Sequence, residues 1–279
     1  MKTLLIPIDF SDTSANVIRY ATDFVKDVNV DRIVLLKSYY TSMAAQLLPS
    51  IDYLQVNAEE ISDERQKIES HVKFIAHKLL KKCSSAIKIE SGISELPLLR
   101  AIHELTDAER PDLIMIGSDH RSREVHSPIG EQVISIAKTS KMPVMIIPAG
   151  LRYQNIKKAL VPCDFTAVSR MALLKELRSS ERWLHPRLMV LNVDPGKINS
   201  IHAEENMEAL KEMLESYAYR VYYSEDQNTI HGILDFSKHK DIQLIIALPG
   251  NYSFFQNLTH HSITNALELN ANQPVLILK

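Results

Sequence analysis

The sequence predicts an α/β protein made of two consecutive domains, each built on a five-stranded parallel sheet. One observation is a long-range repeat, because residues 4–11 and 159–166 are both short apolar runs that end in Pro-X-Asp-Phe and a hydroxyl residue. Another is that short β-branched and Leu-rich runs alternate with amphipathic stretches, which is typical of βα units. The length of 279 residues also exceeds what one core usually fills. We therefore expect domains over residues 1–149 and 156–279.

In the first domain, strands are expected at residues 3–8, 32–37, 86–90, 112–116 and 144–147. Ser11 or Asp12 can cap the first helix through a side-chain oxygen. The apolar stripe of that helix consists of Val17, Ala21, Phe24 and Val25.

Two further helices of the first domain follow from their apolar spacing. One begins at about residue 58 and places on one face Ile61, Ile68, Val72, Ile75 and Leu79. The next is expected to be capped by Ser94 and to bury Leu98, Leu99, Ile102 and Leu105.

The second domain repeats this order, with strands expected at residues 157–162, 187–193, 217–223, 242–248 and 275–278. Its closing run resembles that of the first domain, but the second copy is shorter. The extra length of the first falls mostly at residues 39–57, which could be a lid over a ligand or a surface excursion packed on the sheet. Residues 150–155 form a linker short enough to make the domains touch.

Composition and charge exclude several classes of protein. Hydrophobic residues make up 45% and charged residues 24%, as in a globular rather than a disordered protein. A net charge of -2 with no long basic run gives no reason to expect nucleic acid. No apolar run approaches the roughly 20 residues that span a bilayer, and no signal segment leads the chain, so we expect a cytoplasmic protein. Cys83 and Cys163 support neither a disulfide framework nor a thiolate metal site.

Two residues of the first domain point to a ligand site. Asp9 sits where the first strand ends and Gly117 where the fourth ends, so both lie at the carboxyl edge of the sheet. A carboxylate there can accept hydrogen bonds from hydroxyls or an amine, and a glycine permits close approach or a positive φ. Helix amides near Gly130 could face a phosphate. The structural alternatives are that Asp9 caps the first helix, Gly117 serves the turn and Gly130 relieves crowding.

The chain resembles a tandem universal stress protein. The resemblance rests on the Pro-X-Asp-Phe-Ser start, the strand and turn at residues 112–117, Gly130 and the Pro143-Val144 pair. It implies the strand order 3-2-1-4-5 with helices on both faces, and a ligand crevice where that order reverses. It also implies that ATP, with magnesium, would contact in the first domain Pro7, Asp9, Ser11, Ser38, Ile116, Gly117, His120, Gly130, Glu131, Gln132 and Val133. Within that set the resemblance puts Asp9 on the ribose, Ser38 near adenine and the 117–133 loop around the phosphates.

The phosphate loop departs from the pattern of the nucleotide-binding members, Gly-x2-Gly-x9-Gly-Ser/Thr. His120 replaces the second glycine and Glu131 replaces the hydroxyl residue. A ring at position 120 obstructs a phosphate, and a carboxylate about 4 Å from one repels it by about 4 kcal/mol at an effective dielectric constant of 20. Arg121 and Arg123 could compensate, or the run could be a solvated loop. In the second domain only Ser262 of this pattern survives.

Three functions follow from these observations. The first is a stress-response binding and signalling module whose first domain holds an adenine nucleotide weakly. The second is a related module that binds proteins or another small ligand and no nucleotide. The third, an ATP-hydrolysing enzyme, is disfavoured because Asp9 lacks an identifiable acid, base or metal partner. No metal site is expected. The closing strands at 144–147 and 275–278 are apolar enough to pair, which would give an intrachain pseudo-dimer and allows a homodimer.

Overall fold

Strands from both halves of the chain form one ten-stranded sheet. The computed structural model describes residues 2–39, 51–118, 128–163, 173–174, 185–193, 203–248 and 273–279. The strands of the first half are β1 (Thr3–Ile8), β2 (Arg32–Ser38), β3 (Lys88–Ser94), β4 (Leu113–Ser118) and β5 (Val144–Pro148). Those of the second half are β6 (Lys158–Pro162), β7 (Arg187–Val193), β8 (Tyr219–Ser224), β9 (Leu244–Ala247) and β10 (Val275–Ile277).

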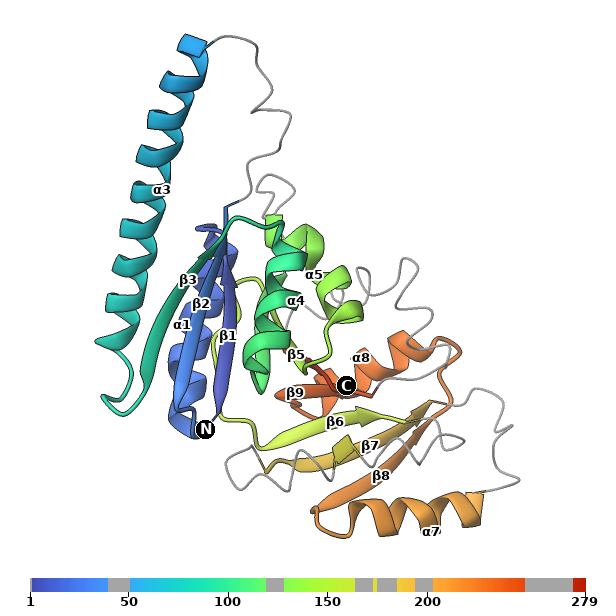
Figure 1. The fold of residues 1–279 in the computed structure, drawn as a ribbon. Helices are drawn as coiled ribbons and strands as arrows, with labels where there is room; N and C mark the ends of the chain where they lie inside the picture. Colours follow the sequence, from blue (N-terminus) through green and yellow to red (C-terminus); the bar gives the residue numbers. More distant parts are fainter. Residues whose placement is uncertain are drawn as a thin grey trace.

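The strand order confirms the expected topology. The first half runs β3-β2-β1-β4-β5 with every pair parallel, which is the order 3-2-1-4-5. The second half runs β8-β7-β6-β9-β10, so it uses the same order. The two halves meet where β10 pairs antiparallel with β5, in a register that places Val144 opposite Ile277. The closing strands therefore pair within the chain (Figure 1).

Helices cover both faces of the sheet (Figure 1). On one face lie α1 (Asp12–Asp27), α3 (Ile51–Leu80) and α7 (Ala203–Leu214), and on the other α4 (Leu98–Glu109), α5 (Pro128–Thr139) and α8 (Thr229–His239). Alternation along β1 explains the two layers, because Leu4, Ile6 and Ile8 join the core beneath α1 while Leu5 joins the core beneath α4 and α5. Both faces are buried, as parallel sheets require.

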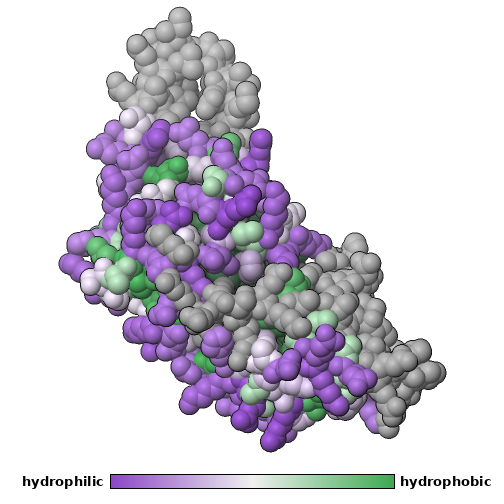
Figure 2. All heavy atoms as spheres, turned by 60° about the horizontal axis from the view of Figure 1, so that its bottom comes forward, coloured by the Kyte–Doolittle hydropathy of each residue, from purple (hydrophilic) through white to green (hydrophobic). Residues whose placement is uncertain are grey.

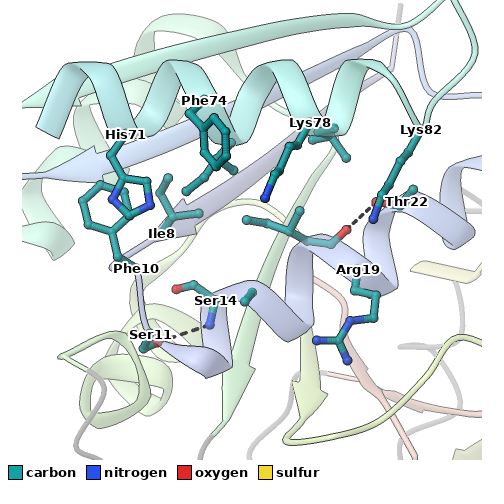
Figure 3. A pocket seen from close by; sticks show the side chains of 14 residues that line it. Ile8, Phe10, Ser11, Ser14, Arg19, Thr22, His71, Phe74, Lys78 and Lys82 are labelled. Carbon is teal, nitrogen blue, oxygen red and sulfur yellow. Dashed lines mark hydrogen bonds between the residues drawn. The ribbon is translucent and has the colours of Figure 1, made fainter. Parts of the chain in front are cut away.

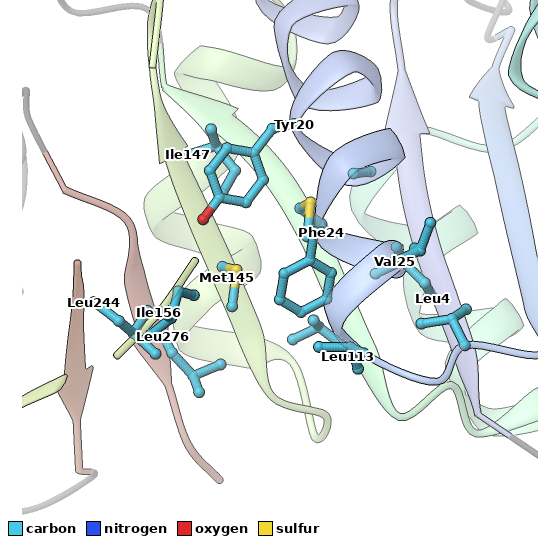
Figure 4. Packing of buried hydrophobic residues seen from close by; sticks show 14 of the residues in the cluster. Leu4, Tyr20, Phe24, Val25, Leu113, Met145, Ile147, Ile156, Leu244 and Leu276 are labelled. Atoms are coloured by element: carbon cyan, nitrogen blue, oxygen red, sulfur yellow. The ribbon is translucent and has the colours of Figure 1, made fainter. Parts of the chain in front are cut away.

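One hydrophobic cluster continues across the junction between the halves. Met145 on β5 lies between Phe24 of α1 on one side and Leu276 of β10 on the other (Figure 4). All three side chains are at most 1% exposed. The core on this face is therefore shared by the two halves.

The first helix forms as its sequence predicts. Ser11 is its N-cap, and the Ser11 Oγ accepts the backbone N–H of Ser14 at 3.2 Å. The stripe of Val17, Ala21 and Phe24 is buried against the sheet.

The long helix α3 begins earlier than predicted, at Ile51 instead of near residue 58. Residues 62–67 are all exposed, and this part of α3 extends past the sheet instead of packing on it (Figure 1). The apolar stripe of the packed part therefore could not indicate where the helix begins. Its lower part packs as expected, with Val72 and Leu79 buried and Ile68 and Ile75 partly buried. The remainder of the predicted 39–57 excursion, residues 40–50, lies outside the described residues.

The predicted cap of α4 is wrong. Ser94 is the last residue of β3, which pairs with β2 as far as Ser38 and so runs past the predicted end at residue 90. The N-cap of α4 is Pro97, which makes no side-chain capping bond. Ser94 Oγ instead accepts the backbone N–H of Leu96 at 3.2 Å, which holds the turn between the strand and the helix. The predicted inward face is confirmed, since Leu98 and Ile102 are buried and Leu99 and Leu105 are partly buried.

The segment between the two half-sheets is fixed to the first helix. Gly150 adopts φ +73°, a left-handed conformation that suits glycine. The Tyr153 hydroxyl and the Asn155 side-chain amide both donate to Asp27 Oδ2, at 2.6 and 2.8 Å. Burial and the neighbouring Asp27 carboxylate raise the pKa of Tyr153, so it remains a neutral donor.

The described surface is mostly hydrophilic, with apolar groups in small separate patches on the face of Figure 2. The large apolar side chains that are exposed in the described chain are Phe74, Leu80 and Tyr223. Within that part of the chain, no helix combines the length and hydrophobicity needed to cross a membrane. Cys83 and Cys163 are both partly buried.

Candidate functional site

The strand order reverses beside β1, and this places two loops at the carboxyl edge of the first half-sheet. After β1 the chain enters α1 on one face, and the helix after β4, α5, packs on the other face. Because these connections diverge, the carboxyl ends of β1 and β4 are where an α/β sheet offers a ligand crevice. Asp9 follows β1 directly, and Gly117 lies near the end of β4.

Asp9 is held by the start of α1. Its Oδ1 accepts the Ser11 backbone N–H at 3.0 Å and also the hydroxyls of Ser11 and Ser14. The Asp9 backbone N–H in turn donates to Ser14 Oγ at 3.0 Å. Asp9 is therefore not the cap itself, since Ser11 occupies that position, but it positions the capping hydroxyl.

The second oxygen of Asp9 reaches the other helix at this edge. Asp9 Oδ2 accepts the backbone N–H of Ile129 at 3.3 Å, in the first turn of α5. A carboxylate at a helix N-terminus is favoured by the helix dipole, and the first backbone N–H groups have no partner within the helix. The Asp9 carboxylate thus joins α1 to α5 across the point where the strand order reverses.

Phe10 next to it adopts an unusual backbone conformation. Its φ is +67°, a left-handed value that costs a non-glycine residue about 1–2 kcal/mol. The ring stacks on His71 of α3 with centroids 4.2 Å apart, and Lys37 Nζ lies 5.1 Å from its centre. Burial lowers the pKa of Lys37, and the Asp9 charge partly opposes that effect. The left-handed residue next to Asp9 is therefore packed between α3 and Lys37 of β2.

Gly117 serves packing and not a turn. A Cβ at this position would lie 2.5 Å from Thr13 Cγ2 and 2.9 Å from Val17 Cγ2, which no ordinary packing allows. The missing side chain lets α1 lie directly on β4. The predicted role in the turn is therefore wrong, because Gly117 is within the strand and α1 occupies the space beside it.

A model of the universal stress protein family matches residues 1–148. The chain belongs to this family. A search of curated protein sequences finds no match.

Solved structures share the fold of this universal stress protein over its whole length. A universal stress protein from Archaeoglobus fulgidus is 20% identical with a TM-score of 0.65, and the alignment covers 99% of this chain and 96% of that one. A functionally unknown protein from Pseudomonas aeruginosa is 12% identical with a TM-score of 0.55, and the alignment covers 100% and 92% of the two chains. At these identities the likeness concerns the fold.

Four other positions expected to contact nucleotide in this universal stress protein lie within strands or helices, and their contact with a nucleotide stays a prediction. Pro7 lies within β1 opposite Leu36 of β2, and Ile116 is buried in the core beneath α4 and α5. Val133 is buried in the same core, and Gln132 beside it is partly buried. Among the described residues, no polar contact directs any of these four side chains toward the carboxyl edge of the sheet.

Ser38 ends β2 at the same edge of the sheet. Its hydroxyl donates to the Leu96 carbonyl at 2.6 Å, so it helps to fix the turn before α4. A hydroxyl that donates one hydrogen bond can still accept another. Ser38 is therefore compatible with a ligand amine as well as with its structural bond.

Several predicted positions cannot be placed. His120, Arg121 and Arg123 lie outside the described residues, as do Asp164 and Ser262 of the second half. Gly130 and Glu131 belong to α5, but the structure describes only their helical backbone and not their surroundings. The phosphate side of the predicted site therefore stays a prediction.

No group of three or more metal-binding side chains occurs within the described segments. His231 and His239 each pair with a nearby acid on their own part of the chain, through Asp226 at 2.6 Å and Asp235 at 3.2 Å. They do not converge on one another.

A groove that sequence reasoning missed lies between α1 and α3. It has a volume of about 330 Å³ and begins beside Phe10, Ser11 and Ser14 (Figure 3). Part of the signal for it is in the sequence, because Phe74 and Lys78 are four residues apart and so share one face of a helix, and Lys82 follows just past the end of α3. The apolar periodicity of α3 identifies only the face that packs on the sheet, and the groove lies along the neighbouring face of the helix.

Proposed function

We propose that this universal stress protein is a non-catalytic binding module in stress signalling, and that its first half binds an adenine nucleotide weakly at the carboxyl edge between β1 and β4. The observation that carries the proposal is the position of the Asp9 carboxylate at the reversal of strand order, next to the N-terminus of α5. Crevices at such reversals bind ligands in α/β proteins.

The residues at this edge suit the ribose and adenine parts of a nucleotide. A carboxylate oxygen has two acceptor positions, so Asp9 Oδ2, which accepts the Ile129 amide, can also accept a ribose hydroxyl. Ser38 can accept from the adenine amine while it donates to Leu96. The described residues supply no phosphate cradle, and the replacements His120 and Glu131 oppose one. Magnesium would enter only with the phosphates. We therefore expect weak binding.

The non-catalytic part of the proposal rests on the partners of Asp9. The Ser11 and Ser14 hydroxyls and the Ile129 amide surround the carboxylate. Hydroxyls and amides of this kind do not act as general bases toward an attacking water. Hydrolysis of nucleotide is therefore not expected.

A second candidate is a module of the same family that binds no nucleotide. The packing of Thr13 and Val17 against Gly117 supports it, because the space that the missing side chain leaves is used by α1 and not by a ligand. The same candidate is our proposal for the second domain, residues 156–279, where the glycine pattern is lost.

Calorimetric titration of the full chain with ATP and magnesium separates the two candidates. We expect a dissociation constant in the millimolar range, near -4 kcal/mol. Asp9→Asn should weaken binding about tenfold, because it removes a charge-assisted acceptor worth about 1.5 kcal/mol. Asp12→Asn is the matched control, since it makes the same change at an exposed position of α1 and should leave the affinity unchanged.

Each outcome has a definite meaning once a thermal melt shows both variants folded. Absence of heat at millimolar nucleotide selects the second candidate. Equal binding by wild type and Asp9→Asn contradicts the proposed site. Release of inorganic phosphate from ATP contradicts the non-catalytic assignment.

A further inference from the structure

The groove between α1 and α3 has two chemically different sides. Figure 3 shows Lys78 on α3 and Lys82, two residues past the end of that helix, extending toward α1, while Arg19 extends from α1 away from α3. Ile18, Ile75 and Leu79 form its apolar part. Phe10 and His71, stacked with centroids 4.2 Å apart, lie at one end.

The charge in the groove has one sign. The residues that line it include Arg19, Lys78 and Lys82 but no carboxylate. None of these three cations takes part in an ion pair within the described chain. Acids near these cations in the sequence are already paired, Asp23 with Lys26 at 2.6 Å, Glu69 with Arg65 at 3.5 Å and Glu90 with Arg32 at 3.1 Å. The groove therefore favours an anion.

The apolar side is accessible from solvent. Phe74 is 53% exposed, although it is a large hydrophobic side chain. Lys78 Nζ lies 4.3 Å from the centre of its ring, a cation–π contact that holds the ammonium group above the apolar surface. The Lys78 ammonium group therefore lies next to the exposed apolar ring of Phe74.

We propose that this groove binds a monomeric aliphatic carboxylate of medium chain length. The carboxylate would lie between Lys78 and Lys82, and the chain would lie on Phe74, Ile75 and Leu79. A neutral apolar ligand would leave the two lysines without an anionic partner, and a small inorganic anion would leave the apolar side of the groove in water. The volume of about 330 Å³ is near the lower end of the roughly 300–1,000 Å³ typical of small-molecule sites, which suits a single chain better than a two-chain lipid.

The test is calorimetric titration of the full chain with hexanoate, octanoate and decanoate below the concentrations at which they form micelles. Each added methylene group should tighten binding by up to about fourfold, the factor that corresponds to about 0.8 kcal/mol. Decanol, which has the same chain without the charge, should bind at least tenfold more weakly than decanoate. Higher salt should weaken decanoate binding.

Two variants locate the site. Lys78→Gln with Lys82→Gln removes both charges but keeps most of each side chain, and should weaken decanoate at least tenfold. Lys73→Gln with Lys81→Gln is the matched control, because both lysines are exposed, outside the groove and in or next to the same helix. Phe74→Ala should reduce the gain per methylene group, and it should leave the fold intact because Phe74 is exposed.

The proposal is overturned if decanoate does not bind, if decanol binds as well as decanoate, or if the control pair weakens binding as much as the groove pair. Binding to vesicles of anionic phospholipid without binding to monomeric decanoate would also overturn it. The outcome does not depend on the nucleotide proposal, since that test uses a different probe and the Asp9→Asn variant.

Discussion

A single missing methyl group near the end of β4 sets how closely α1 approaches the sheet. Gly117 faces Thr13 and Val17, and the three together bring the start of α1 to the edge where Asp9 lies. Asp9 in turn bonds to Ser11, Ser14 and Ile129, so the arrangement at this edge depends on a few atoms. Gly117, which the resemblance placed at the start of the phosphate loop, therefore packs closely against α1.

We expect Gly117→Ala to destabilise the protein by about 1–3 kcal/mol, the usual cost of overpacking a core. The new Cβ would lie 2.5 Å from Thr13 Cγ2. Chemical denaturation of wild type and variant measures the change in the free energy of unfolding.

Gly92→Ala is the matched control, because it is also a strand glycine but has no atom within 4 Å of the added Cβ. It should be neutral or slightly stabilising, since alanine restricts the unfolded chain more than glycine does. Adding Thr13→Ser to Gly117→Ala should restore part of the loss by removing the contacting methyl group. Equal effects of the two glycine substitutions would show that the close approach of α1 is not what matters.

At the scale of elements, the N-terminus of α8 contains an ion pair that should respond to pH. Asn228 caps the helix, and its side chain accepts the His231 backbone N–H at 3.0 Å. His231 Nδ1 lies 2.6 Å from Asp226 Oδ2. The hydrogen bond and charge of Asp226 raise the pKa of His231 above 6.5, and the same contact lowers the pKa of Asp226 below 3.8.

The pair should stabilise the protein between about pH 4 and pH 6.5 and lose its effect as the pH rises further. A raised histidine pKa means that the folded state binds the proton more tightly, so this contribution is present below the unfolded value and disappears above the folded one. The effect is small because His231 is exposed.

His231→Gln tests this expectation through melting temperatures measured from pH 5 to pH 9. The difference between wild type and variant should be largest near pH 5.5 and vanish near pH 9. His239→Gln, in the last turn of the same helix, controls for a general effect of losing a histidine. A difference that grows toward alkaline pH would contradict the assignment.

At the scale of the whole molecule, β5 pairs antiparallel with β10, so the strands of the two half-sheets run in opposite directions. The carboxyl ends of β1 and β6 therefore point toward opposite edges of the sheet. A ligand at the carboxyl edge of the first half therefore cannot also reach the equivalent edge of the second half. Both halves share the core around Met145.

Because of that shared core, we expect the two halves to unfold as one cooperative unit. Leu35→Ala in β2, far from the junction, should cost about 2–5 kcal/mol. The one tryptophan of the chain, Trp183, belongs to the second half. Its fluorescence should report the same shifted midpoint as far-UV circular dichroism. A tryptophan transition that is unchanged by Leu35→Ala would show that the halves unfold independently.

The pairing also bears on assembly. The closing strands that could have joined two chains are already paired within one. We predict that light scattering after size exclusion gives the mass of one chain or of a dimer formed through another surface. A larger assembly would contradict this prediction.

Much of the fold follows from the sequence because it rests on local patterns. The repeated Pro-X-Asp-Phe runs, the β-branched strands and the Ser11 cap each depend on a few neighbouring residues. The predictions failed where contacts between distant segments determine the local structure. Ser94 is an example, because its pairing with Ser38 of β2 keeps it within strand β3. They also failed for the start of α3, which extends past the core that would have marked it.

The sequence by itself determined the fold class and the positions of Asp9 and Gly117 at the carboxyl edge, because apolar periodicity and short motifs are written in consecutive residues. Its motifs also resemble those of the universal stress protein family, and that resemblance implied the strand order. Only the tertiary structure decided that Gly117 makes room for α1, that Asp9 links two helices, and that a cationic groove lies between α1 and α3. These features depend on distances between segments far apart in the chain. No local pattern encodes such distances.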